Sequence, residues 1–225
     1  MDKFSDDSII KSWAKNASPW VTAVQKQQIE SRKLVTDHAI INTIAALPSV
    51  NSVLDIGCGE GWLCRKLSTM GFNVMGIDAT PALINNARKH DNGRYEVLAY
   101  EDVSSHTVSS TFDVAVCNFA LLGKESVAAL FKAIPPLLND KAYLVIQTLH
   151  PISSCGEAEY EDGWREGSWA GFNEDFCDPA PWYFRTIESW RALFLDNGFI
   201  LAPLTEPVSP STGIAASLIM TGRKR

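Results

Sequence analysis

The central part of the chain alternates between short apolar runs and stretches with helical periodicity. Runs rich in β-branched or apolar residues lie at 52–56, 73–77, 95–99, 112–117 and 142–148. The helical stretches between them lie at 62–70, 81–90 and 126–138. Alternation of strand and helix predicts βαβ units, and therefore an α/β fold with a mostly parallel sheet and helices on both faces. Runs such as DVAVC and AYLVIQT are almost wholly apolar, as strands buried on both faces require.

The N-terminal part is predicted to be helical. Leu34, His38, Ile41 and Ala45 recur at spacings of four, three and four, which places them on one helical face. We therefore expect His38 to be a core histidine with a satisfied hydrogen bond.

After His150 the alternation stops, and it resumes with a helix near 187–197 and two strands at 199–202 and 214–221. We expect a single domain, 1–225. Its predicted parts are a helical N-terminal part (1–47), a core of alternating strands and helices (48–150), an insertion (151–185), and a C-terminal helix with strands (186–225).

The first predicted strand leads into a loop with glycine at every second position: Gly57, Gly59 and Gly61. Doubly wound sheets bind ligands at the carboxyl ends of their strands. Glycine has no Cβ to hold a ligand away from the main chain. The spacing does not fit G-x-G-x-x-G of dinucleotide sites, and the Gly-Lys pair of a P-loop is missing here. A carboxylate two residues before the glycines, Asp55, suits an ammonium group better than a phosphate.

This D-x-G-x-G-x-G pattern resembles the first motif of class I S-adenosylmethionine-dependent methyltransferases of the small-molecule type. The resemblance extends from about residue 52 to the C-terminus. It implies a Rossmann-like, mostly parallel seven-stranded sheet, with a helical N-terminal cover and a lid inserted after the fifth strand. It also implies S-adenosyl-L-methionine as the cofactor and S-adenosyl-L-homocysteine as its product.

The resemblance also implies roles for single residues. Asp78 ends the second strand. In the family an acid at this position accepts hydrogen bonds from both ribose hydroxyls, and the alternative role for Asp78 is a helix N-cap. Either Glu101 or Asp102 stands where an acid lies near the adenine, and the sequence does not decide between them. Phe119 either lies beside the transferring methyl or belongs to the core. The predicted cofactor-binding residues are Asp55, Gly57, Cys58, Gly59, Asp78, Ala79, Glu101, Asp102, Asn118, Phe119 and Arg32.

The acceptor is expected to meet the end of the fifth strand and the predicted lid. His150 ends that strand, and we predict that it orients or deprotonates the acceptor; the alternative is a hydrogen bond within the loop. The lid interleaves aromatic residues, which supply contact area for an organic molecule, with acids that either attract a cation or keep the lid soluble. The predicted acceptor-binding residues are Trp20, Tyr160, Trp164, Trp169, Trp182 and Arg185.

Composition and charge exclude several classes of partner. The 225 residues are 46% hydrophobic and 20% charged, as in ordinary globular domains. Residues 151–185 hold eight acids and two arginines, which account for the net charge of −6. Because a basic face is missing, we expect no nucleic-acid partner. No apolar run reaches the ~18–20 residues of a membrane span, and the acidic N-terminus lacks the order of an export signal. We therefore expect no membrane partner and a cytoplasmic location.

The cysteines and histidines indicate neither disulfides nor a metal site. Five cysteines without C-x-x-C spacing predict free thiols, and the four scattered histidines predict no metal site. Oligomeric state cannot be predicted from this sequence. The predicted function is methylation of a small organic molecule, on oxygen. The alternatives are methylation of an amine and a non-catalytic module that binds S-adenosylmethionine, whereas the glycine spacing disfavours a nicotinamide-dependent oxidoreductase.

Overall fold

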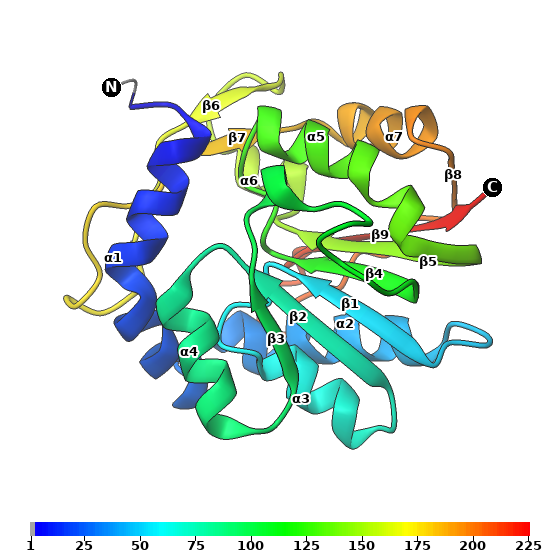
Figure 1. Cartoon of the computed structure of the whole chain (residues 1–225). Helices are drawn as coiled ribbons and strands as arrows, with labels where there is room; N and C mark the ends of the chain where they lie inside the picture. The colour runs from blue at the N-terminus through cyan, green and yellow to red at the C-terminus, as the bar shows by residue number, and fades with distance from the viewer. Residues whose placement is uncertain (1–2) are drawn as a thin grey trace.

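The computed structural model describes residues 3–225 and contains a seven-stranded sheet in the order β3-β2-β1-β4-β5-β9-β8 (Figure 1). Strands β3, β2, β1, β4 and β5 run parallel, β9 is antiparallel to β5, and β8 is antiparallel to β9. The strands are β1 (Ser52–Ile56), β2 (Asn73–Asp78), β3 (Arg94–Val97), β4 (Phe112–Asn118), β5 (Leu138–Thr148), β8 (Phe199–Leu201) and β9 (Leu218–Lys224). The predicted mostly parallel, seven-stranded sheet is confirmed.

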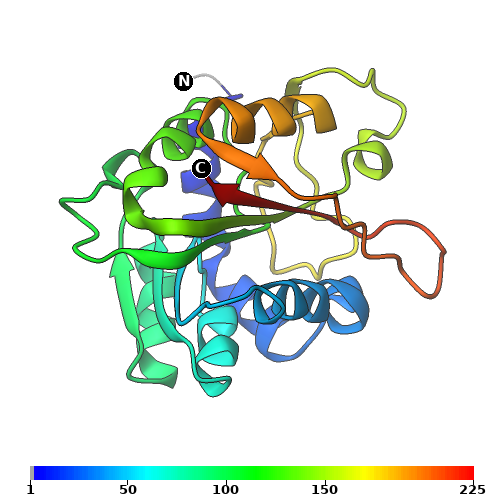
Figure 2. The ribbon, with the colours of Figure 1, turned by 90° about the vertical axis from the view of Figure 1, so that its right-hand side faces the viewer.

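Helices cover both faces of this sheet. They are α1 (Asp6–Gln25), the π-helical turn η1 (Arg32–Thr36), α2 (Asp37–Ala45), α3 (Trp62–Thr69), α4 (Pro81–His90), η2 (Tyr100–Asp102), α5 (Glu125–Ala133), η3 (Pro135–Leu137), α6 (Pro151–Cys155) and α7 (Ile187–Asp196). One core cluster buries Phe131 of α5 and Phe194 of α7 against the sheet. The other buries residues of α2, α3 and α4, among them Ile40 and Leu63. Figure 2 shows α7 and α2 on opposite sides of the sheet.

Local sequence signals account for most element boundaries. Helix α4 begins with Pro81 at its first position, where proline's missing N–H costs no hydrogen bond. Helix α5 ends at Ala133, earlier than predicted, because two prolines follow and convert the next turn to 3₁₀ geometry. The last strand begins at Leu218 rather than at 214, since Ala215 instead forms an isolated bridge with Val208.

The predicted core face of the N-terminal helices is wrong for three of its four residues: Ile41 is buried, but Leu34, His38 and Ala45 are not. Leu34 and His38 are exposed, whereas Ile40 and Ile44 are fully buried. Within α2 the buried side is formed by Ile40, Ile41 and Ile44, and His38 and Ala45 lie off that side. Leu34 lies inside the π-helical turn η1, where the 3.6-residue period does not hold. His38 is therefore a surface residue and not a core histidine.

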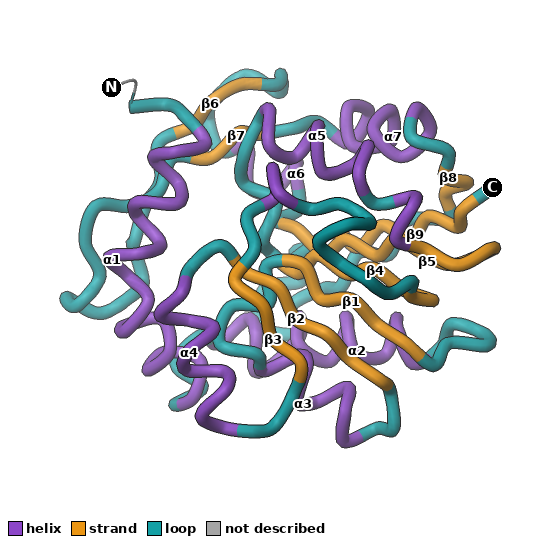
Figure 3. Tube along the Cα trace, in the orientation of Figure 1, coloured by secondary structure: helices purple, strands orange, loops and turns teal. Residues whose placement is uncertain are grey.

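Residues 151–185, here called the cover segment, contain α6 and a hairpin of β6 (Gly163–Arg165) and β7 (Trp182–Phe184). Its connecting loop runs beside α1 (Figure 3). The Asn16 side chain, wholly buried on α1, donates to the Cys177 carbonyl at 2.7 Å and accepts from the Cys177 N–H at 2.9 Å. Lys15 and Asp178 add an ion pair at 2.5 Å. These contacts hold the cover segment against α1. No helix within residues 3–225 has the length and apolar character needed to cross a membrane.

Candidate functional site

A cavity of about 490 Å³ lies where β1, β2 and β4 end, enclosed by α1 and the cover segment. Its volume falls within the ~300–1,000 Å³ typical of sites for small ligands. The strand order reverses between β1 and β4, and this is the place where doubly wound sheets form a crevice. The fold therefore positions one ligand-sized cavity at the edge that the glycine loop occupies.

The glycine loop approaches the cavity with bare main chain. Gly57, Gly59 and Gly61 have φ values of 77°, 58° and 83°, a region that favours glycine. A Cβ on Gly57 would lie 2.4 Å from the Ala120 Cβ, so close packing requires glycine there. At Gly59 the nearest heavy atom would be the Trp20 Nε1 at 3.7 Å. Gly57 and Gly59 line the cavity, as does Cys58 between them.

Asp78 lies opposite this loop and also lines the cavity. Its Oδ2 accepts from the Gly59 N–H at 3.0 Å and its Oδ1 from the Thr80 N–H at 2.8 Å. Burial raises the pKa of Asp78, and these hydrogen bonds oppose the increase. A carboxylate offers about four acceptor positions, so both oxygens can accept further bonds. The N-cap of α4 is Thr80 and not Asp78.

Asp55 does not line the cavity. Its carboxyl is 1% exposed and lies beneath the loop, where the Cys64 thiol donates to its Oδ2 at 3.3 Å. Burial raises the pKa of Asp55 to about 7. The predicted direct contact between Asp55 and the cofactor is therefore wrong, because the strand directs this side chain into the protein interior.

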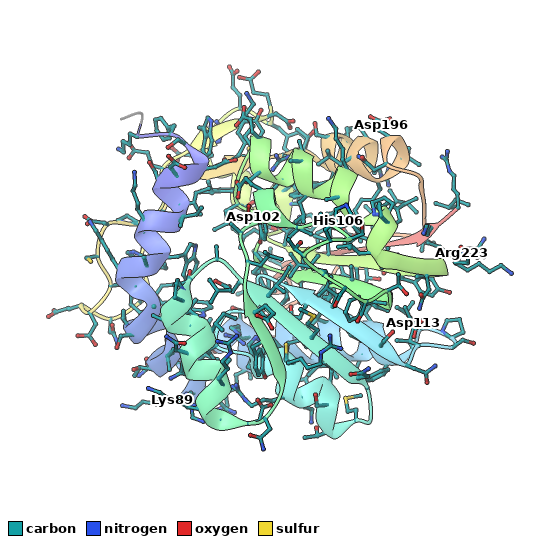
Figure 4. The ribbon with its side chains drawn as sticks, in the orientation of Figure 1. Lys89, Asp102, His106, Asp113, Asp196 and Arg223 are labelled. Atoms are coloured by element: carbon teal, nitrogen blue, oxygen red, sulfur yellow. The ribbon has the colours of Figure 1, made fainter. Side chains whose placement is uncertain are left out.

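Of the two acids predicted to lie near the adenine, Glu101 and Asp102, only one lines the cavity. Glu101 lines the cavity and Asp102 does not, although both residues are exposed. Asp102 lies on the connection between β3 and β4, close to His106 (Figure 4). The prediction for Asp102 is therefore wrong. Tyr100 lines the cavity as well, although the sequence pattern did not single it out, and its hydroxyl donates to the Ala120 carbonyl at 3.1 Å.

The end of β4 and the turn η1 add polar groups. Asn118, Phe119 and Arg32 all line the cavity, as does Ala79 after β2. Phe119 has a φ of 53° and is partly exposed, so it is not a core residue. The Asn118 Oδ1 is buried and has no hydrogen-bond partner.

Arg32 has a fixed position. Its Nε and Nη2 donate to Asp37 at 3.0 and 3.3 Å, and its guanidinium lies 4.7 Å from the Trp62 ring centroid. Its Nη1 is buried and has no partner. The side chain thus holds a cationic donor at the wall of the cavity.

The predicted catalytic role of His150 is not supported by the structure. Its side chain does not line the cavity, although Leu149 and Pro151 on either side of it do. The ring is 6% exposed, and its Nε2 lies 2.7 Å from the Glu206 Oε1. His150 therefore takes the alternative role, a hydrogen bond that holds a loop. No local signal reveals this, because Glu206 is distant in sequence.

The predicted acceptor residues divide into two groups. Trp20, Trp169, Trp182 and Arg185 line the cavity. Tyr160 and Trp164 do not, so those two predictions are wrong. Tyr160 packs on Phe184, with ring centroids 5.7 Å apart, and its hydroxyl accepts from the Ile187 N–H. Trp164 packs on Tyr183, with ring centroids 5.6 Å apart.

Several lining residues were missed by sequence reasoning. They include Asp6, Ile9, Ile10, Trp13, Phe172, Tyr183 and Trp190. The first four share a face of α1 with Trp20 at helical spacings, a period that the sequence contains. Phe172 and Tyr183 depend on how the cover segment folds over α1, for which no local pattern exists, and Trp190 lies on α7.

Comparisons with known proteins show the family and the fold. Residues 29–203 match the family of methyltransferase domains. The chain is similar to the ubiquinone biosynthesis O-methyltransferase of Xanthomonas axonopodis pv. citri, with 32% identity over 108 residues, which cover 46% of this chain and 45% of that protein. It is also 31% identical over 107 residues to the mitochondrial ubiquinone biosynthesis O-methyltransferase of Schizosaccharomyces pombe, covering 45% of this chain and 39% of the relative. The match thus spans less than half the length of both curated relatives.

Solved structures share the fold. An S-adenosylmethionine-dependent methyltransferase from Mesorhizobium loti superposes with a TM-score of 0.62 at 22% identity, covering 82% of this chain and 96% of that one. The magnesium protoporphyrin IX methyltransferase of Synechocystis, with bound S-adenosylhomocysteine, has a TM-score of 0.63 at 16% identity and covers 98% of this chain and 100% of that one. The chain belongs to the methyltransferase domain family, and it has the fold of class I S-adenosylmethionine-dependent methyltransferases.

Proposed function

We propose that the protein transfers a methyl group from S-adenosylmethionine to an oxygen atom of a small organic acceptor. The observation that carries the proposal is the continuity of one cavity, which has the glycine loop and Asp78 at one end and an aromatic wall at the other. In this proposal the N-terminal helices (1–47) and the cover segment enclose the reactants, and residues 48–150 hold the cofactor.

The polar groups at the glycine end fit an amino-acid nucleoside and not a diphosphate. The main chain at Gly59 is accessible, and Asp78 presents two carboxylate oxygens to ribose hydroxyls. Glu101 also lines the cavity, and in this proposal it accepts from the adenine amino group. The unpartnered Nη1 of Arg32 suits a carboxylate, and the unpartnered Oδ1 of Asn118 suits an ammonium group. Two acids at this end would repel phosphates, so the fit favours S-adenosylmethionine.

The chain mainly has to align the acceptor and exclude water. S-adenosylmethionine, when bound, supplies a methyl group that is already activated for displacement. Alignment alone can contribute up to ~7–11 kcal/mol of barrier reduction. Interlocking rings restrict the space for the acceptor: Trp13 packs edge-on against Trp169 with centroids 5.8 Å apart, and Trp169 against Phe172 at 5.3 Å.

Oxygen is favoured over nitrogen as the methylated atom. The two curated relatives named above are O-methyltransferases. None of the eight acids within 151–185, all in the described part of the chain, lines the cavity. The acidic cover segment therefore gives no support to a cationic amine acceptor. A non-catalytic binding module would need no aromatic compartment beside the cofactor.

Two measurements test the proposal. Calorimetry should show that S-adenosylmethionine and S-adenosylhomocysteine bind and that NAD does not. Incubation with methyl-labelled cofactor and a metabolite extract should then yield a labelled small molecule whose methyl group is on oxygen. Tight binding of NAD would overturn the assignment, and a labelled amine product would replace O-methylation by N-methylation.

A further inference from the structure

We propose that the acceptor is a small aromatic carboxylate whose anionic end pairs with Arg185; this inference rests on the proposed methyl transfer and names its substrate class. Arg185 follows β7 directly and precedes Thr186, the N-cap of α7. Its backbone is thus fixed between two regular elements. Its side chain lines the cavity and is 6% exposed.

The guanidinium is held in one orientation. It stacks on the Tyr183 ring at 4.8 Å and on the Trp190 ring at 5.1 Å, measured to the ring centroids. Its Nη2 donates to the Lys124 carbonyl at 2.9 Å. Because a planar guanidinium presents its donors in a rigid fork, these contacts fix where its remaining N–H groups point.

The Arg185 guanidinium has one donor without a partner and no direct ion pair to another described residue. Its Nη1 is buried and has no hydrogen-bond partner, and no ion pair to Arg185 occurs among residues 3–225. The acids that act on it electrostatically are Asp162, Asp6 and Glu125. Each is engaged elsewhere: Asp162 and Asp6 accept backbone N–H bonds, and Glu125 pairs with Lys124.

A buried cation without a partner is costly, whereas a carboxylate in bidentate contact with an arginine forms one of the stronger charge-assisted pairs. Burial lowers the pKa of Arg185, but an arginine stays protonated in proteins. A carboxylate that reaches Nη1 would therefore satisfy a donor that the folded chain leaves unpaired. Because Nη1 is covered by protein atoms, pairing requires a small shift of the side chains beside it.

The position of Arg185 separates it from the cofactor end. It lies near Asp6, at the start of α1, whereas Trp20 near the end of α1 faces Gly59. Asp6 and Trp20 are 14 positions apart on α1, about 21 Å at ~1.5 Å per residue. The other arginine that lines the cavity, Arg32, lies beside Trp20 and already pairs with Asp37. The two arginines thus serve opposite ends of the cavity.

The rest of this end is aromatic, which fits a flat ring. Tyr183 and Trp190 contact the Arg185 guanidinium, and Trp182 beside Tyr183 also lines the cavity. Aromatic faces and edges favour a planar apolar ligand. A ring carrying a carboxylate satisfies both the apolar wall and the arginine.

The test compares aromatic acids with their uncharged amides on protein saturated with S-adenosylhomocysteine. The probes are 4-hydroxybenzoate, 3,4-dihydroxybenzoate and cinnamate with the matching amides, followed by quenching of tryptophan fluorescence and by calorimetry. We expect at least one acid to bind about tenfold tighter than its amide, equivalent to about 1.4 kcal/mol. This comparison within the wild type does not depend on how any variant folds.

Three variants assign the preference to one side chain. Arg185→Met should abolish the preference for the acid, and Arg185→Lys should keep part of it. Arg165→Met is the matched control, because Arg165 also lies over an aromatic ring, 5.2 Å from the Phe184 centroid, but does not line the cavity. It should retain the preference.

The outcomes separate this inference from the proposed function. Failure of S-adenosylhomocysteine to bind the wild type would overturn the proposed function itself. Cofactor binding with equal affinity for acids and amides would overturn only the inference. The inference also fails if no acid binds at low millimolar concentration, or if Arg185→Met keeps the full preference.

Discussion

The substitution Gly59→Ala isolates the claim that a ligand lies against bare main chain. The added Cβ would have only the Trp20 Nε1 within 4 Å, at 3.7 Å. The Gly59 N–H that donates to Asp78 is kept, because alanine has the same backbone donor. The fold therefore loses little packing, and the cavity gains one methyl group where the cofactor is expected.

The substitution is expected to lower both the stability of the fold and the affinity for the ligand, for separate reasons. At a φ of 58°, alanine is less stable than glycine by about 1–2 kcal/mol. For a chain of this size this lowers the melting temperature by about 2–8 °C. A methyl group forced into a packed contact costs about 1–3 kcal/mol. Affinity for S-adenosylhomocysteine should therefore fall by about 5- to 150-fold.

Calorimetry with S-adenosylhomocysteine and thermal unfolding measure the two costs. Gly198→Ala is the matched control, because Gly198 has a φ of 84°, no atom lies within 4 Å of its added Cβ, and it does not line the cavity. Both variants should lose similar stability, and only Gly59→Ala should lose affinity. If Gly59→Ala binds the ligand as tightly as the control does, the main chain there does not contact the cofactor and the reasoning fails.

Three further predictions concern acids and the histidine. Asp78→Ala should weaken cofactor binding by at least about tenfold, because hydrogen bonds to a charged group are worth ~1.5–3 kcal/mol each. Asp102→Ala should leave cofactor affinity unchanged. If calorimetry gives the wild type and Asp78→Ala equal affinity, Asp78 does not bind the ribose. The unfolded Asp55 ionises near pH 3.8 but the folded one near 7, so stability falls as the pH rises between these values, by up to about 4 kcal/mol. Asp55→Asn should lack that decline in chemical denaturation, and parallel stability curves would contradict it. His150→Gln should lower the melting temperature but leave the pH profile of methyl transfer unchanged, whereas loss of one limb of the profile would restore a catalytic role.

Sequence patterns were sufficient where structure is set locally. The alternation of apolar runs and helical stretches predicts β1, β2 and α4 closely. The glycine loop and Asp78 could be identified because a strand end, a tight loop and the next strand end lie close together in sequence. Their physical requirement, a main chain without Cβ beside a carboxylate, involves only the loop at 57–61 and Asp78, 17 residues after Gly61.

The errors arise where side-chain direction depends on distant partners. His150 turns away from the cavity because Glu206 on the C-terminal loop holds its ring. Tyr160 and Trp164 pack within the hairpin of the cover segment instead of facing the acceptor. An aromatic residue in this segment can therefore serve either the wall of the cavity or the outer hairpin, and its residue type does not distinguish the two.

A crystal structure of the protein with S-adenosylhomocysteine tests the central claim most directly. We predict that the ribose hydroxyls bind the carboxylate of Asp78, that the chain of the ligand passes over Gly59, and that its sulfur faces the aromatic end of the cavity. Density for the ligand elsewhere on the surface, or a crevice that stays empty at saturating ligand, would contradict the account.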